Sequence, residues 1–161
     1  MGRVRLDIID DKMGIHVKLA EALGALDNGS FVEVGDLIDN DDYRDLYETK
    51  ALTASPTQIA MIADDGHIYD EHDDGYDIVV EKGAIVRAYL LHINQVVTVD
   101  VARLDGTGFK KGDKLVPVAG GVKLGKVATS SATDETATPV AVVQALEEDM
   151  EGNELVVIKF L

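Results

Sequence analysis

The densest group of side chains able to do chemistry lies at residues 64–77 (DDGHIYDEHDDGYD), with seven carboxylates, two histidines and no basic residue. Carboxylate oxygens bind hard cations such as Ca²⁺, and His67 with His72 could add nitrogen ligands for a transition metal. The spacing fits no specific motif, because an EF-hand loop needs acidic residues at alternate positions, glycine at position six and glutamate at position twelve. We therefore predict a solvated acidic loop, with no metal site and no cofactor.

The other candidates for catalysis carry weaker signals. His92 lies in an apolar run, which favours a hydrogen-bonded strand residue over a catalytic base, and His16 has no nucleophile or carboxylate at a meaningful spacing. Arg87 is the only charge in 84–91, so we expect it to leave the sheet or to pair with a carboxylate. No serine lies in a Gly-x-Ser-x-Gly elbow, and no glycine-rich stretch matches a phosphate-binding loop. We therefore predict that the protein is not an enzyme and has no catalytic residues.

Composition narrows the class of protein further. The chain has 161 residues, of which 46% are hydrophobic and 28% charged, as in ordinary globular domains. It has no cysteine, which excludes disulfides and thiolate metal sites. A formal charge of -15 would repel phosphate backbones and anionic membranes, so we expect neither nucleic acid nor membrane as a partner. The first residues lack an apolar signal region and no stretch is long enough to span a membrane, so we expect a soluble, unprocessed protein.

Charge is distributed unevenly along the chain. Residues 1–50, 51–81 and 127–161 carry net charges of -6, -8 and -6, whereas residues 82–126 carry +5. A basic middle in an acidic chain could be an interaction face for an acidic partner. The alternative that we favour is neutralisation between segments that touch in the fold.

Frequent turn signals separate short apolar runs, which predicts a mainly β fold. Two pairs of runs read as hairpins: 115–118 with 122–127 around Gly120-Gly121, and 140–146 with 155–161 around Gly152-Asn153. Residues 97–101 (VTVDV) alternate, which predicts a strand with buried valines on one face and a wet face carrying Thr98 and Asp100. Pro117 lacks a ladder donor, so its strand should be at an edge or carry a bulge.

We expect a small antiparallel β-barrel or sandwich with an N-terminal arm or subdomain and at most one or two short helices. One helix is predicted at 16–25 (HVKLAEALGA) and ends at Gly24, while 40–46 could form a helical turn or 45–52 a strand. The predicted organisation is an N-terminal arm or subdomain over 1–77, which includes the acidic loop 64–77, and a compact β-barrel domain over 78–161.

Several stretches, in order along the chain, carry a family resemblance. They are 26–37 (LDNGSFVEVGDL), 47–54 (YETKALTA), 81–100 (EKGAIVRAYLLHINQVVTVD), 112–117 (GDKLVP) and 138–146 (TPVAVVQAL). Together they resemble the head decoration, or capsid cement, proteins of tailed bacteriophages. In that family a glycine and an acid usually form the turn after the R-x-Y-x-L-H pattern, where this chain has Asn94 and Gln95. Asparagine tolerates the left-handed conformation, so the turn can be kept.

The resemblance implies a non-enzymatic virion protein that binds the outer surface of the phage capsid lattice and stabilises the expanded head. Its partner would be the major capsid protein, and it would be made in the bacterial host cytoplasm and act as a homo-oligomer, with a trimer favoured. We expect the lattice contact on the N-terminal region or on the basic span 82–126.

Two alternatives stay open. The first is a tail, baseplate or host-surface-binding β module of a phage, which would share the acidic β-rich character. The second is a small metal-dependent β-barrel enzyme that uses His67, His72 and the nearby carboxylates.

Overall fold

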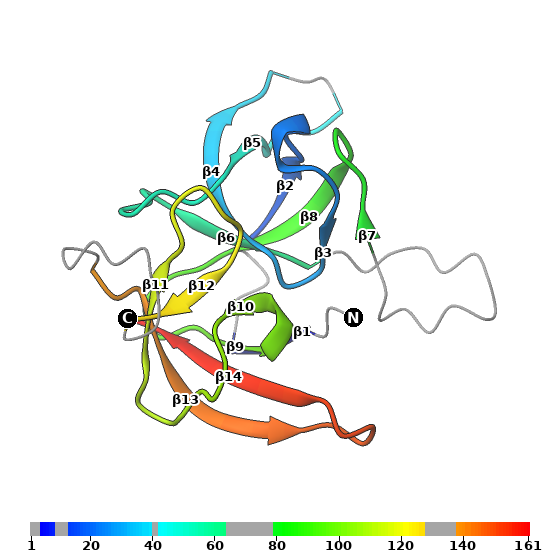
Figure 1. The fold of residues 1–161 in the computed structure, drawn as a ribbon. Helices are drawn as coiled ribbons and strands as arrows, with labels where there is room; N and C mark the ends of the chain where they lie inside the picture. Colours follow the sequence, from blue (N-terminus) through cyan, green and yellow to red (C-terminus); the bar gives the residue numbers. More distant parts are fainter. Residues whose placement is uncertain (1–3, 9–12, 40–41, 64–78, 128–137) are drawn as a thin grey trace.

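A computed structural model describes residues 4–8, 13–39, 42–63, 79–127 and 138–161 (Figure 1). The described residues are mainly β, as predicted, and the helical elements described in full are two single 3-10 turns, η2 (Glu21–Leu23) and η3 (Val101–Arg103). The strands are β1 (Val4–Ile8), β2 (Gly14–Lys18), β3 (Leu26–Asp27), β4 (Phe31–Leu37), β5 (Leu46–Lys50), β6 (Ile59–Ile62), β7 (Val79–Val80), β8 (Ile85–Leu90), β9 (Val96–Asp100), β10 (Leu104–Asp105), β11 (Lys114–Pro117), β12 (Leu124–Lys126), β13 (Ala141–Glu148) and β14 (Glu154–Phe160). Within these ranges no helix is long and apolar enough to cross a membrane.

Five strands close a barrel in the order β2-β5-β4-β6-β8, seen in the upper half of Figure 1. Its neighbours are antiparallel except β2 and β5, which run parallel. Apolar side chains at alternate strand positions fill the interior, among them Val17, Val32 and Ala88. Burial of this set is the hydrophobic driving force that closes the barrel.

The second sheet has seven strands in the order β1-β9-β14-β13-β11-β12-β10. Its apolar face packs on the outside of the barrel, in one cluster that contains Val97, Ile158, Phe31 and Met61. Phe31 and Met61 come from barrel strands β4 and β6, whose other face lines the barrel interior. Every residue of β6 (IAMI) is therefore buried, which explains why that strand is a continuous apolar run without alternation.

Sheet membership does not follow the predicted division of the chain at 77/78. Strand β8 pairs with β2 and β6 in the barrel, although it lies in the predicted C-terminal domain. Strand β1 pairs with β9 in the seven-stranded sheet, although it lies in the predicted N-terminal region. The boundary itself and the acidic loop 64–77 lie outside the described residues. The two sheets share one apolar cluster in the described part of the chain.

Both predicted hairpins are confirmed. Strand β11 pairs with β12 around Gly120, whose φ is 77°, and β13 pairs with β14 around Gly152, whose φ is 83°. Strand β11 lies inside the sheet order, between β12 and β13. Pro117 nevertheless pairs only with Leu124 of β12, because the ladder to β13 covers Lys114 and Leu115 alone. The missing donor of the proline therefore breaks no ladder bond.

Two expectations about local structure were wrong. Residues 14–18 form strand β2 and only 21–23 form a helical turn, because Ile15, Val17 and Leu19 are buried at alternate positions as in a strand. The wet face expected on residues 97–101 is also absent, since all five residues of β9 are buried. The Asp100 carboxylate accepts a hydrogen bond from the Ala102 backbone N–H at 2.8 Å and so caps η3, which gives the buried acid a partner.

The open choice between a helical turn at 40–46 and a strand at 45–52 resolves in favour of the strand, β5. Asn94 has a φ of 69° and is the only described non-glycine residue with positive φ, so it takes the left-handed turn position expected of it. Its backbone N–H donates to the Phe160 carbonyl at 2.9 Å, which joins the β8–β9 turn to the end of β14.

Candidate interaction sites

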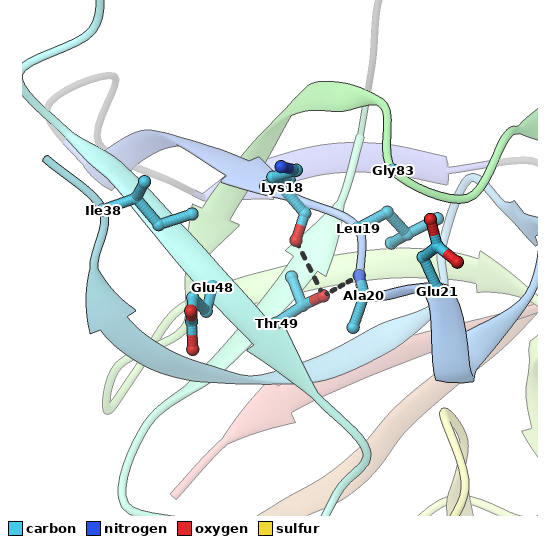
Figure 2. Close-up of a pocket in the computed structure, with 8 residues that line it drawn as sticks. All are labelled: Lys18, Leu19, Ala20, Glu21, Ile38, Glu48, Thr49 and Gly83. Atoms are coloured by element: carbon cyan, nitrogen blue, oxygen red, sulfur yellow. Dashed lines mark hydrogen bonds between the residues drawn. The ribbon is translucent and has the colours of Figure 1, made fainter. Parts of the chain in front are cut away.

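An open pocket of about 390 Å³ lies beside the end of β2, where the chain turns into η2 (Figure 2). Its walls come from four segments that are distant in sequence: the end of β2 with η2, the residue after β4, strand β5 and the turn before β8. The lining residues are Lys18, Leu19, Ala20, Glu21, Ile38, Glu48, Thr49 and Gly83. The volume falls within the range typical of small-molecule binding pockets.

Buried hydrogen bonds fix the walls of this pocket. The Thr49 hydroxyl accepts from the Ala20 N–H at 2.9 Å and donates to the Lys18 carbonyl at 3.0 Å, as drawn in Figure 2. On the other side, the Gly83 N–H donates to the Leu19 carbonyl at 2.8 Å. Thr49 is 3% exposed, so its hydroxyl satisfies backbone groups that water reaches poorly. The pocket is therefore held open by the barrel itself.

Three charged side chains line the pocket: Lys18, Glu21 and Glu48, all exposed. Lys18 and Glu48 are register partners on the parallel strands β2 and β5, yet no ion pair forms between them. In the described part of the chain none of the three side chains has a hydrogen-bond or ion-pair partner. Their charge is available to a ligand.

A second polar group lies further along the outside of the same two strands. The His16 Nδ1 atom is 3.1 Å from Asp45 Oδ1, and the His16 ring lies 4.7 Å from the Tyr43 ring, centroid to centroid. No partner for His16 was predicted, because Asp45 is 29 residues away and is brought close only by the parallel pairing of β2 with β5. Only a sequence pattern showing that 14–18 pairs with 46–50 would have predicted the His16–Asp45 contact.

The other sequence candidates occupy structural positions. The Arg87 guanidinium lies over the Tyr89 ring, 5.1 Å from its centroid, so its contact in the described residues is cation–π and not an ion pair. His92 is exposed in the β8–β9 turn, so the prediction that it lies in a strand was wrong. His67 and His72 lie outside the described residues. Within the described ranges no group of three or more His, Asp or Glu side chains could hold a metal ion.

The basic span 82–126 is partly neutralised by the fold. Lys126 Nζ lies 2.7 Å from Asp113 Oδ2, and Arg103 pairs with Asp27. The hydrogen bond from Lys126, followed by the bond from the Lys110 backbone N–H, lowers the pKa of Asp113 below its ordinary value.

Exposed basic side chains remain in the span: Lys82, Lys110, Lys111, Lys114 and Lys123. Because Asp113 is itself part of the span, only the Arg103–Asp27 pair joins the span to an acid of another segment, and the loop before β11 keeps a local positive charge.

The β13–β14 hairpin projects away from the barrel in Figure 1 and ends in an acidic tip. Asp149 Oδ1 accepts from the Glu151 N–H at 2.8 Å and from the Asn153 N–H at 2.9 Å, so the turn is fixed by its own side chain. Met150 is fully exposed at the tip.

These observations define a β-barrel joined to a seven-stranded sheet through a shared core. No protein-family model matches the chain, and no curated protein matches it with significant similarity.

Proposed function

We propose that this protein is a phage head decoration protein, which binds the outer surface of the capsid lattice and stabilises the expanded shell without catalysing a reaction. Its partner in this proposal is the major capsid protein, its location is the virion surface, and its assembly is a homo-oligomer, with a trimer favoured.

The observation that carries the proposal is where the resembling stretches lie in the fold. Residues 26–37 supply β3 and β4, 47–54 most of β5, and 81–100 supply β8 and β9. Residues 112–117 and 138–146 supply β11 and most of β13. The resembling stretches thus lie on strands that contribute to both cores, and they include the turn where Asn94 replaces the usual glycine. A likeness confined to surface loops would carry less weight, because core strands specify the fold.

The exposed lysines of the basic span are the proposed lattice contact. Lys110 and Lys111 lie in the loop before β11, and Lys114 begins that strand, all exposed. Charge complementarity at such a face would orient an otherwise acidic protein on the shell. Many equivalent sites on a shell let a modest affinity per copy stabilise the whole particle through mass action.

Co-sedimentation with undecorated, expanded capsids of the phage that encodes the protein tests the proposal. Saturation at a copy number compatible with the shell symmetry is the expected result. Absence of binding to expanded and unexpanded shells would contradict it and favour the tail or host-surface alternative. The triple variant K110E/K111E/K114E tests the contact separately, because unchanged occupancy would exclude the basic span but leave decoration intact.

A further inference from the structure

We infer that the pocket beside β2 and β5 is an anchor site for a basic side chain, lysine or arginine, of a partner protein. The inference does not depend on the capsid assignment, because it concerns what chemistry the pocket accepts and not which protein supplies it.

The apolar part of the pocket suits the alkyl stem of such a guest. Ala20 and Ile38, both half-buried, contribute apolar lining, and the Ile38 side chain points toward the centre in Figure 2. Lysine and arginine place three or four methylene groups along apolar surface while the charged head stays at the polar rim. An entirely polar ligand would leave this lining without a partner.

The charge around the pocket favours a cation. Glu21 and Glu48 stand at the rim, and neither is neutralised by an ion pair to another described residue. Lys18 is the one cation of the lining, so the pocket carries a net formal charge of -1. The long flexible stem of Lys18 lets its ammonium move into solvent when a guest cation pairs with either carboxylate. The net charge of -15 on the whole chain adds a long-range field of the same sign.

The walls are rigid enough to act as a preformed site. The Thr49 hydroxyl ties the end of β2 to β5, and the Leu19–Gly83 hydrogen bond ties it to the turn before β8. A preformed pocket spends little free energy on ordering when a guest enters, which is how anchor side chains at interfaces gain most of their effect.

The test uses NMR titration of the ¹⁵N-labelled full chain with three amino-acid derivatives of similar size. N-acetyl-arginine methylamide supplies the cation, N-acetyl-norleucine methylamide the uncharged stem, and N-acetyl-glutamate methylamide the anion. We expect saturable shifts of the Ala20, Glu21 and Gly83 amides with the arginine derivative, weakened by added salt. Tighter binding of either other derivative, or no saturable shift at these amides, would overturn the inference.

A charge-matched pair of variants assigns the effect to the pocket. E21Q/E48Q should weaken binding of the arginine derivative by about three- to fivefold, the effect of one solvent-exposed ion pair to whichever carboxylate the guest contacts. E148Q/E154Q changes the net charge of the chain equally at the β13–β14 hairpin and should leave the affinity within about twofold, since exposed charges beyond a Debye length are screened. Equal losses in both variants would show a general charge effect and overturn the pocket assignment. All four glutamates are exposed, so both variants should fold, which the amide spectrum checks directly.

Discussion

Replacement of Phe31 by alanine tests whether the barrel and the seven-stranded sheet fold as one unit. Phe31 belongs to barrel strand β4, is 0% exposed, and lies in the cluster shared with the second sheet. Its ring centroid is 6.4 Å from that of Phe160 in β14, with the planes tilted by 49°. Truncation removes the ring from a closely packed core and leaves a cavity between the sheets.

The expected loss in the free energy of unfolding is about 3 to 5 kcal/mol, as for buried phenylalanines in general. For a chain of this length, each kcal/mol lowers Tm by roughly 2 to 4 °C, so the midpoint should fall by roughly 6 to 20 °C. The double variant F31A/F160A should show a coupling energy of about 0.5 to 1.5 kcal/mol, because the two rings contact each other.

Urea unfolding followed by circular dichroism gives the free energies, and hydrogen exchange reports where protection is lost. F31A should show a single transition and lower protection in both sheets, because one shared cluster stabilises them. V32A is the matched control, since Val32 is the next residue of β4 but faces the barrel interior. A loss in the free energy of unfolding below about 1 kcal/mol, or two separate transitions of which F31A shifts only one, would show that the two sheets do not fold as one unit.

Three further predictions concern polar and backbone positions. T49V should lower the free energy of unfolding, measured by chemical denaturation, by about 1 to 3 kcal/mol, because the Ala20 N–H and the Lys18 carbonyl lose their hydrogen-bond partner. T53V, at an exposed position, should lower it by less than about 1 kcal/mol. Equal losses would contradict a structural role for the Thr49 hydroxyl. Asn94→Val should cost about 1 to 3 kcal/mol and Asn94→Gly about 0.5 kcal/mol or less in the same assay, since a β-branched residue resists positive φ. The wild type should be more stable than D113N above pH 3.8, the ordinary pKa of the acid, and this difference should shrink as pH falls through the lowered pKa of Asp113 in the folded state. Thermal melts over a range of pH measure the difference. A difference that grew on acidification would contradict the lowered pKa.

Sequence reasoning succeeded where the determinants of structure are local. The Gly120 and Gly152 turns each supply a positive φ between two apolar runs, so both hairpins were predictable from a few neighbouring residues. The left-handed turn at Asn94 follows from the same local chemistry.

Prediction from the sequence failed where contacts between distant segments decide the local structure. The run 16–25 has an apolar spacing compatible with a helix, but pairing of β2 with both β5 and β8 makes its first part a strand. Thr98 and Asp100 were expected in water, but both are buried in β9, which pairs with β1 at one edge and with β14 at the other. The walls of the pocket come from four segments of the chain, so no sequence window contains it.

Cryo-electron microscopy of expanded capsids, reconstructed with and without the added protein, tests decoration most directly. We predict additional density at symmetry-related positions on the outer surface, large enough for the barrel and the seven-stranded sheet, at an occupancy that matches the saturating copy number. Shells that look the same with and without the protein at saturating concentration, or density only at the tail vertex, would contradict the account.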